Sequence, residues 1–245
     1  MRKSLLESAG KASSSARLLT SIAAAATFFV TTATVAAWPG TAVPGTPVCL
    51  RMAIVPDVPL DHPTISNARS AFKVAGVCTE TIPMPVRRSE QLIHTGGLDG
   101  DFLRTKLWAE MHADEVLLVP TPVAVDQMVV ISLIKKRAEF PQMASLSGHM
   151  VAISAGHRWA EQKLAEVNAK AIGTNSAFKI LELVRHGRVD AGLVEASLLP
   201  PENERTDIRI DPVSKISYHI VLLKKHVKML PALNAALIKS GTLSY

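Results

Sequence analysis

The sequence predicts an α/β protein built from two modules, each with a parallel sheet at its core. Three observations lead to this prediction. Strand and helix signals alternate over residues 49–103, and the same alternation returns over residues 148–194. Between them, residues 116–133 are extended, rich in Val and Ile, and carry no helix signal. A β-α-β order favours parallel strands joined by right-handed crossovers.

Pro and Gly residues mark the ends of the predicted strands and helices in the first module. Pro56 and Pro59 stop its first strand, and Gly76 ends its first helix, whose apolar residues lie on one face. A Gly-Gly pair after Thr95 ends the second helix. The predicted elements are a strand at 49–55, a helix at 65–76, a strand at 77–82, a helix at 87–95 and a short strand at 98–103.

The second module repeats this order with different spacing. We expect a strand at 148–153, helices at 158–168 and 177–186, and a strand at 189–194; after a polar loop come a strand at 216–223 and a closing helix at 231–239. The chain should cross between modules near 129–134 and 210–216, and the closing helix should pack on the first module. The first module then comprises 38–131 and 213–245, and the second 132–212.

The N-terminal stretch is typical of a secretory signal peptide. Residues 1–17 are basic, residues 18–30 are apolar, and Val35 and Ala37 suit a cut after Ala37. Four of the 27 Lys and Arg residues and one of the 21 acidic residues lie in 1–37, so the remainder carries a formal charge of +3. An uncleaved anchor is the alternative, since the apolar run approaches spanning length. Cleavage predicts a periplasmic protein.

Composition narrows the function classes. Hydrophobic residues make up 48% and charged residues 20%, which indicates a folded chain. Aromatic residues are only 4%, which argues against base-stacking nucleic-acid platforms. Two cysteines exclude a multi-cysteine metal scaffold. Serine-hydrolase, zinc-protease and phosphate-loop motifs are absent from the sequence, so we expect no catalytic residue, no cofactor and no metal site.

Four segments, taken in order, carry a family resemblance: LIHTGGLDG at 92–100, SLSGHMVAISAG at 145–156, AFKILELVRHGRVDAGLVE at 177–195, and the strand and Pro-started helix of 218–241. With the signal peptide, this order resembles the family 3 periplasmic solute-binding proteins of ABC transporters, of the polar amino-acid type. The resemblance implies the two-lobed type II periplasmic-binding fold. It also implies a small-molecule ligand, an amino acid or organic acid, held between lobes, an ABC permease as partner, and a monomer without nucleic acid.

The chain departs from that family in three places. Residues 56–60 offer no aromatic side chain after the first strand. His157 and Arg158 stand where small hydroxyl residues are usual, and Glu195 replaces an aspartate.

Six residues are candidates for ligand binding. By the resemblance, Arg104 would clamp a carboxylate with its planar guanidinium. The N–H groups of the turn at Gly156, His157 and Arg158 would bind an anion at a helix start. Glu195 would pair with a ligand ammonium. Asp57 follows the first strand, where parallel sheets place ligands. We expect Asp99 and Asp190 to be structural.

The same fold predicts a disulfide. Cys49 opens the first strand and Cys78 opens the second, and in the resembled fold these strands are parallel neighbours. Export permits oxidation, so we expect a Cys49–Cys78 bond.

Two other function classes stay open. An enzyme on the same scaffold, such as a periplasmic dehydratase, would use Glu195 or His157 as general acid or base. A sensory domain would pass its ligand state to a membrane partner. Formation of product from candidate solutes would distinguish the enzyme from the binding protein.

Overall fold

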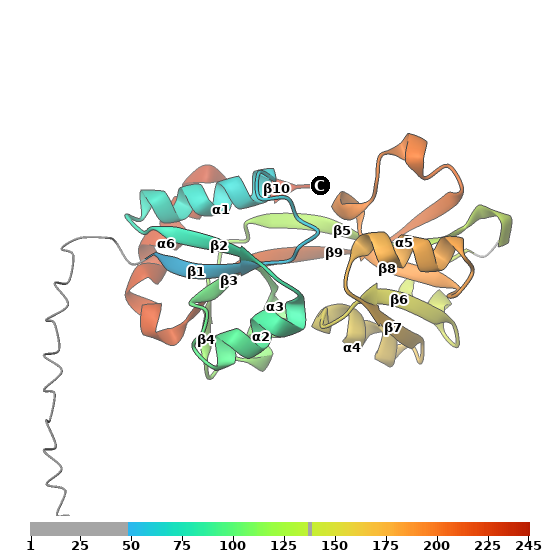
Figure 1. Ribbon diagram of the computed structural model, residues 1–245, viewed down its shortest axis with the longest axis horizontal. Coiled ribbons are helices and arrows are strands. Elements are labelled where there is room, and N and C mark those ends of the chain that lie inside the picture. Colours follow the sequence, from blue (N-terminus) through green and yellow to red (C-terminus); the bar gives the residue numbers. More distant parts are fainter. Residues whose placement is uncertain (1–48, 137–138) are drawn as a thin grey trace, which may run out of the picture. The chain divides into compact units, whose positions relative to one another are not determined.

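A computed structural model describes residues 49–136 and 139–245 (Figure 1). The expected signal peptide at 1–37 and the lead-in at 38–48 lie outside the described residues. No helix in the described ranges is long and apolar enough to cross a bilayer.

The first half contains the expected parallel β-α-β-α-β unit. Strand β1 lies between β2 and β3, and both neighbours run parallel to it. Helix α1 begins at Pro63, where the lost N–H costs nothing, and its chain leaves through Gly76, whose φ is +74°. The elements are β1 (Leu50–Ile54), α1 (Pro63–Val74), β2 (Thr79–Pro83), α2 (Val86–His94), β3 (Gly100–Thr105), α3 (Lys106–Met111) and β4 (Val116–Leu118).

Helix α3 was not among the expected elements. It has six residues, too few to show a helical apolar pattern, and it begins where the Thr105 side chain accepts a hydrogen bond from the N–H of Trp108. Trp108 and Ala109 are its buried residues.

The second half has its own parallel unit, β6 flanked by β7 and β8. Its elements are β6 (Met150–Ser154), α4 (Arg158–Glu166), β7 (Lys170–Thr174), α5 (Ala177–Arg185) and β8 (Ala191–Glu195). The sequence prediction missed β7, and placed only a connection there. Lys170, Ala171 and Gly173 are exposed at the sheet edge, so the strand carries no apolar pattern.

Two long antiparallel strands, β5 (Ala124–Leu133) and β9 (Ile208–Leu223), join the halves. They lie between the parallel units in the order β2-β1-β3-β9-β5-β8-β6-β7. The two expected parallel cores are therefore parts of one mixed sheet (Figure 1). The crossings that the sequence predicted near 129–134 and 210–216 fall on these strands.

Helices cover both faces of each half. Helices α1 and α6 (Leu230–Ser240) pack on one face of the first half, as expected for the closing helix, and α2 and α3 lie on the other (Figure 1). In the second half α4 and α5 take opposite faces. The remaining elements are the 3-10 turns η1 (Ile134–Lys136), η2 (Met143–Leu146), η3 (Ala196–Leu198), η4 (Glu202–Glu204) and η5 (Lys224–Met229), and the strand β10 (Leu243–Ser244).

The expected disulfide is present. Cys49 and Cys78 are bonded, with their Cα atoms 4.5 Å apart. They precede β1 and β2, whose register pairs Leu50 with Thr79, and the Leu50 N–H donates to the Cys78 carbonyl at 2.9 Å. The parallel pairing of these two strands thus brings the cysteines to one edge of the sheet, and the prediction is confirmed.

Candidate functional site

A cavity of about 100 Å³ lies where the two halves meet. Its walls come from the β1–α1 loop, the end of β3, the turn before α4, the end of β8 and the joining strands β5 and β9. All six residues predicted to bind ligand line this one cavity: Asp57, Arg104, Gly156, His157, Arg158 and Glu195. Each of them lies at or just beyond the end of a strand, where open α/β sheets bind ligands.

Asp57 connects the halves directly. Its Oδ2 accepts a hydrogen bond of 2.8 Å from the backbone N–H of Ala177, in the first turn of α5. A carboxylate at a helix N-terminus is favoured by the helix dipole. Burial nevertheless raises the pKa of Asp57, and the charge of Glu195 adds to the rise, although the bond from Ala177 opposes it.

Arg104 is buried, with 5% of its surface exposed. Its Nε donates to Asp101 Oδ2 at 2.9 Å, and its Nη2 donates to the Val86 carbonyl at 3.2 Å and to the Ser89 hydroxyl. The guanidinium also lies over the Trp108 ring, 4.4 Å from the centroid. The charge of Arg104 is therefore already matched by a buried carboxylate of its own half.

The turn before α4 also satisfies its own polar groups. Gly156 has a φ of +86°, and its N–H donates to Glu161 Oε1 at 3.0 Å. His157 caps the helix, since its Nδ1 accepts from the Ala160 N–H at 3.2 Å. The N–H of Gly156, expected from sequence to face an anion, is thus bonded within the turn, and so is the N–H of Ala160.

Arg158 links α4 to α2 of the other half. Its Nη2 donates to Glu90 Oε1 at 2.7 Å, and its Nη1 donates to Glu161 Oε2 at 3.0 Å. Burial alone would raise the pKa of Glu90, but the bond from Arg158 lowers it below its usual value. Arg158, like Arg104, therefore has acidic partners of its own.

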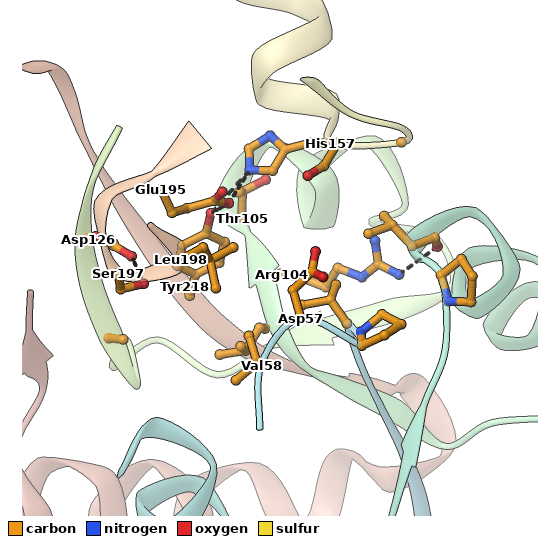
Figure 2. A pocket seen from close by; sticks show the side chains of 18 of the residues that line it. Asp57, Val58, Arg104, Thr105, Asp126, His157, Glu195, Ser197, Leu198 and Tyr218 are labelled. Atoms are coloured by element: carbon orange, nitrogen blue, oxygen red, sulfur yellow. Dashed lines mark hydrogen bonds and ion pairs between the residues drawn. The ribbon is translucent and has the colours of Figure 1, made fainter. Parts of the chain in front are cut away.

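Glu195, His157 and Tyr218 form a hydrogen-bonded network at one end of the cavity (Figure 2), in which Glu195 is buried and the other two residues are partly buried. The Tyr218 hydroxyl donates to Glu195 Oε1, and His157 Nε2 lies 3.1 Å from the Tyr218 oxygen and 3.3 Å from Glu195 Oε1. Because Nδ1 accepts from Ala160, the hydrogen bonds assign the ring proton to Nε2. Burial and the charge of Glu195 raise the pKa of Tyr218 well above its usual value, so the phenol stays protonated.

Asp126 and Ser197 also line the cavity and were missed by sequence reasoning. The Ser197 hydroxyl donates to Asp126 Oδ2, and the Gln127 N–H donates to Oδ1 at 2.7 Å. Burial raises the pKa of Asp126, and the charge of Glu195 raises it further. A signal was present: Asp126 is the only charged residue in the apolar run 123–133.

Aromatic side chains reach the cavity from unexpected places. Tyr218 comes from β9, Trp108 from α3, and Tyr245 from the residue after β10. The Tyr245 hydroxyl bonds the Thr64 hydroxyl at 2.8 Å, and its ring lies 5.3 Å from that of His62. None of the three comes from residues 56–60, the segment after the first strand, which contains no aromatic residue.

Asp190 and Asp99 have the structural roles expected of them. Asp190 Oδ2 accepts from the Met150 N–H, and Asp99 Oδ2 accepts from the Arg51 N–H, each at 2.9 Å. Within the described residues, no cluster of three or more His, Cys, Asp or Glu side chains is arranged to hold a metal ion.

Comparison with known proteins relates the fold to one structural group. No protein-family model matches the chain, and no curated protein sequence matches it. Solved structures do match. An arginine-bound mutant of ArgBP from T. maritima is 16% identical over 78% of this chain and 95% of its own, with a TM-score of 0.67.

Two further structures agree. AbpA, an amino acid ABC transporter substrate-binding protein from Streptococcus pneumoniae bound to L-arginine, is 17% identical over 78% of this chain and 87% of its own, with a TM-score of 0.63. The GluR0 ligand-binding core in complex with L-glutamate is 13% identical over 80% and 93%, with a TM-score of 0.66. At these identities the likeness is one of fold, and the two-lobed binding-protein fold expected from the sequence is confirmed.

Proposed function

We propose that this chain is a solute-binding protein that captures a small polar solute between its two lobes and delivers it to an ABC transporter. The observation that carries the proposal is the convergence of six residues, chosen from sequence alone, on one cavity lined by both halves. The neighbours reported above are binding proteins rather than enzymes, and two of them hold arginine. This supports capture without chemical conversion of the solute.

The contacts between the halves support a hinge mechanism. Asp57 of the first half bonds the start of α5, and Glu90 of α2 bonds Arg158 of α4. Both contacts would break if the halves moved apart, while β5 and β9 would remain continuous between them. A solute that contacts both halves therefore favours this closed arrangement over an open one.

The proposed setting is the periplasm, with the chain acting as a monomer beside an ABC permease. The disulfide supports an oxidising compartment, and the basic and apolar start of the sequence supports export.

The proposal is tested by ligand screening of the protein lacking residues 1–37. We expect at least one compound among amino acids, organic acids and amines to raise the melting temperature and to bind with simple one-site stoichiometry by calorimetry. The bound compound should be recovered unchanged after long incubation. A converted product would instead identify an enzyme, and no response across all three classes would contradict solute binding.

A further inference from the structure

The charges around the cavity indicate which part of a solute it recognises, and this inference rests on the proposed function. The groups suited to binding an anion are mostly bonded within the protein. Arg104 donates hydrogen bonds from Nε to Asp101 and from Nη2 to the Ser89 hydroxyl and the Val86 carbonyl. Among the described residues, its Nη1 has no hydrogen-bond partner. A two-pronged clamp on a carboxylate uses N–H groups of two nitrogens, and the described contacts leave only one nitrogen of Arg104 free, so Arg104 offers no such clamp.

Arg158, the other arginine at the cavity, also donates its terminal nitrogens to partners within the protein. Arg158 gives one terminal nitrogen to Glu90 and the other to Glu161, and its Nε is buried. Glu161 also takes the Gly156 N–H. A ligand carboxylate at this turn would have to displace Glu161 and would meet its negative charge.

Three carboxylates at the cavity have no such arginine partner among the described residues. Asp57, Asp126 and Glu195 all line the cavity. Throughout the part of the chain that the structure describes, neither Lys nor Arg lies within ion-pair distance of any of the three; Glu195 has only His157, at 3.3 Å. Asp126 and Glu195 are 4% and 9% exposed. Bonds from His157 and Tyr218 hold the pKa of Glu195 below its usual value despite its burial. Asp57 and Asp126 have no basic partner within the described ranges, and a buried carboxylate of that kind is costly, so it marks a place where a positive charge is missing.

The effect of the carboxylates on one another's pKa also indicates a site for a cation. The charge of Glu195 raises the pKa of Asp57 and that of Asp126, in addition to the effect of burial. Glu195 is therefore close enough to each of the other two carboxylates to repel it. A cation placed among them relieves that repulsion, whereas an anion increases it.

We propose that the cavity recognises the ammonium or guanidinium group of a small organic cation, and that it binds this cation without gripping a carboxylate. Asp57 from the first half, Asp126 from β5 and Glu195 from the second half supply the negative charge, and Tyr218 keeps Glu195 oriented. The cavity volume of about 100 Å³ restricts the solute to a small molecule.

Matched pairs of compounds test the proposal. Agmatine and arginine share a guanidinium chain and differ by the carboxylate, and putrescine and ornithine form the same kind of pair. Calorimetric titration of the protein lacking residues 1–37 should show the carboxylate-free member binding at least tenfold more tightly in each pair. Butyrate and succinate should not bind.

Substitutions test whether the carboxylates of the cavity bind the cation. Asp126→Asn and Glu195→Gln should each weaken the binding of the preferred cation roughly tenfold or more, as expected for loss of a charge-assisted contact. Asp114→Asn, which removes one negative charge from an exposed position outside the cavity, should leave affinity unchanged. Circular dichroism of each variant checks that it is folded.

The outcomes separate the two proposals. Tighter binding of arginine than agmatine, or of ornithine than putrescine, would overturn the cation proposal and leave solute binding standing. Binding of cations that is equally insensitive to Asp126→Asn and Asp114→Asn would also overturn it. If amines, amino acids and organic acids all fail to bind the folded protein, the cation proposal and the proposed function both fail.

Discussion

Gly156 lies where closure of the lobes should be most sensitive to one added methyl group. A Cβ at this position would lie 2.9 Å from Arg87 Cγ and 3.2 Å from Val86 Cγ1, both in α2 of the opposite half. The residue also has a φ of +86°, which disfavours any residue but glycine. Gly156→Ala therefore has two separate consequences, one for folding and one for closure.

A second glycine separates them. Gly148 lies in the same half and has a φ of +76°, but a Cβ there would meet nothing within 4 Å. Gly148→Ala and Gly156→Ala should each lose about 1–2 kcal/mol of unfolding free energy from the left-handed backbone. Only Gly156→Ala adds the contact with α2, which by analogy with overpacked sites costs about 1–3 kcal/mol in the closed form.

That closure cost should appear as roughly 5- to 150-fold weaker solute binding in Gly156→Ala than in Gly148→Ala. Urea unfolding measures the shared backbone effect, and titration with the solute found by screening measures the difference. Small-angle scattering adds a reading without solute, since Gly156→Ala should raise the radius of gyration. Equal affinities and equal radii in the two variants would show that Gly156 and α2 do not meet when the protein binds.

Three further predictions follow from the described contacts. Replacing Cys49 and Cys78 by Ser should lower the unfolding free energy by about 3–4 kcal/mol, because the bond closes a loop with a sequence separation of 29; two free thiols in the denatured native chain would contradict it. Asp126→Asn should raise the melting temperature at pH 7 and much less near pH 3.5. The raised pKa of Asp126 means that the folded state keeps this proton to a higher pH than the unfolded state, so the wild-type chain loses stability as pH rises above the usual aspartate range; an equal shift at both pH values would refute this. Arg104→Ala should cost about 3–5 kcal/mol by urea unfolding, since it leaves Asp101 buried without its partner; a loss below 1 kcal/mol would show that the pair is not buried in solution.

The sequence predicted those parts of the fold whose burial leaves a pattern. Strand β5 and the part of β9 from residue 216 onward are apolar enough to be predicted as extended segments, and α6 shows its core residues at helical spacing. The first part of β9, residues 208–215, is polar and was predicted to be largely loop. The sequence prediction missed strand β7 because an exposed edge strand needs no apolar residues. It missed helix α3 because six residues are too few to show a helical period of apolar residues.

The residues of the site also divide into those that the sequence indicates and those that it does not. Asp57, Arg104, Gly156 and Glu195 could be found because each lies at or beyond a strand end, and topology brings such ends together. Asp126 and Tyr218 lie within the joining strands, where the face that a side chain takes depends on register. Their register is fixed by the pairing of Ala124 with Tyr218 and of Asp126 with Ile216, which no local pattern reveals.

The distribution of the three carboxylates gives the closing step a driving force. Asp57 belongs to the first half and Glu195 to the second, so bringing the halves together brings like charges together. A cation between them turns that repulsion into attraction from both sides, and binding is thereby coupled to closure. A carboxylate would have no such effect, because it would first have to separate Arg104 from Asp101 or Arg158 from Glu161. On the cation proposal, the charge of Glu195, which raises the pKa of both Asp57 and Asp126, is thus what would couple closure to a positively charged solute.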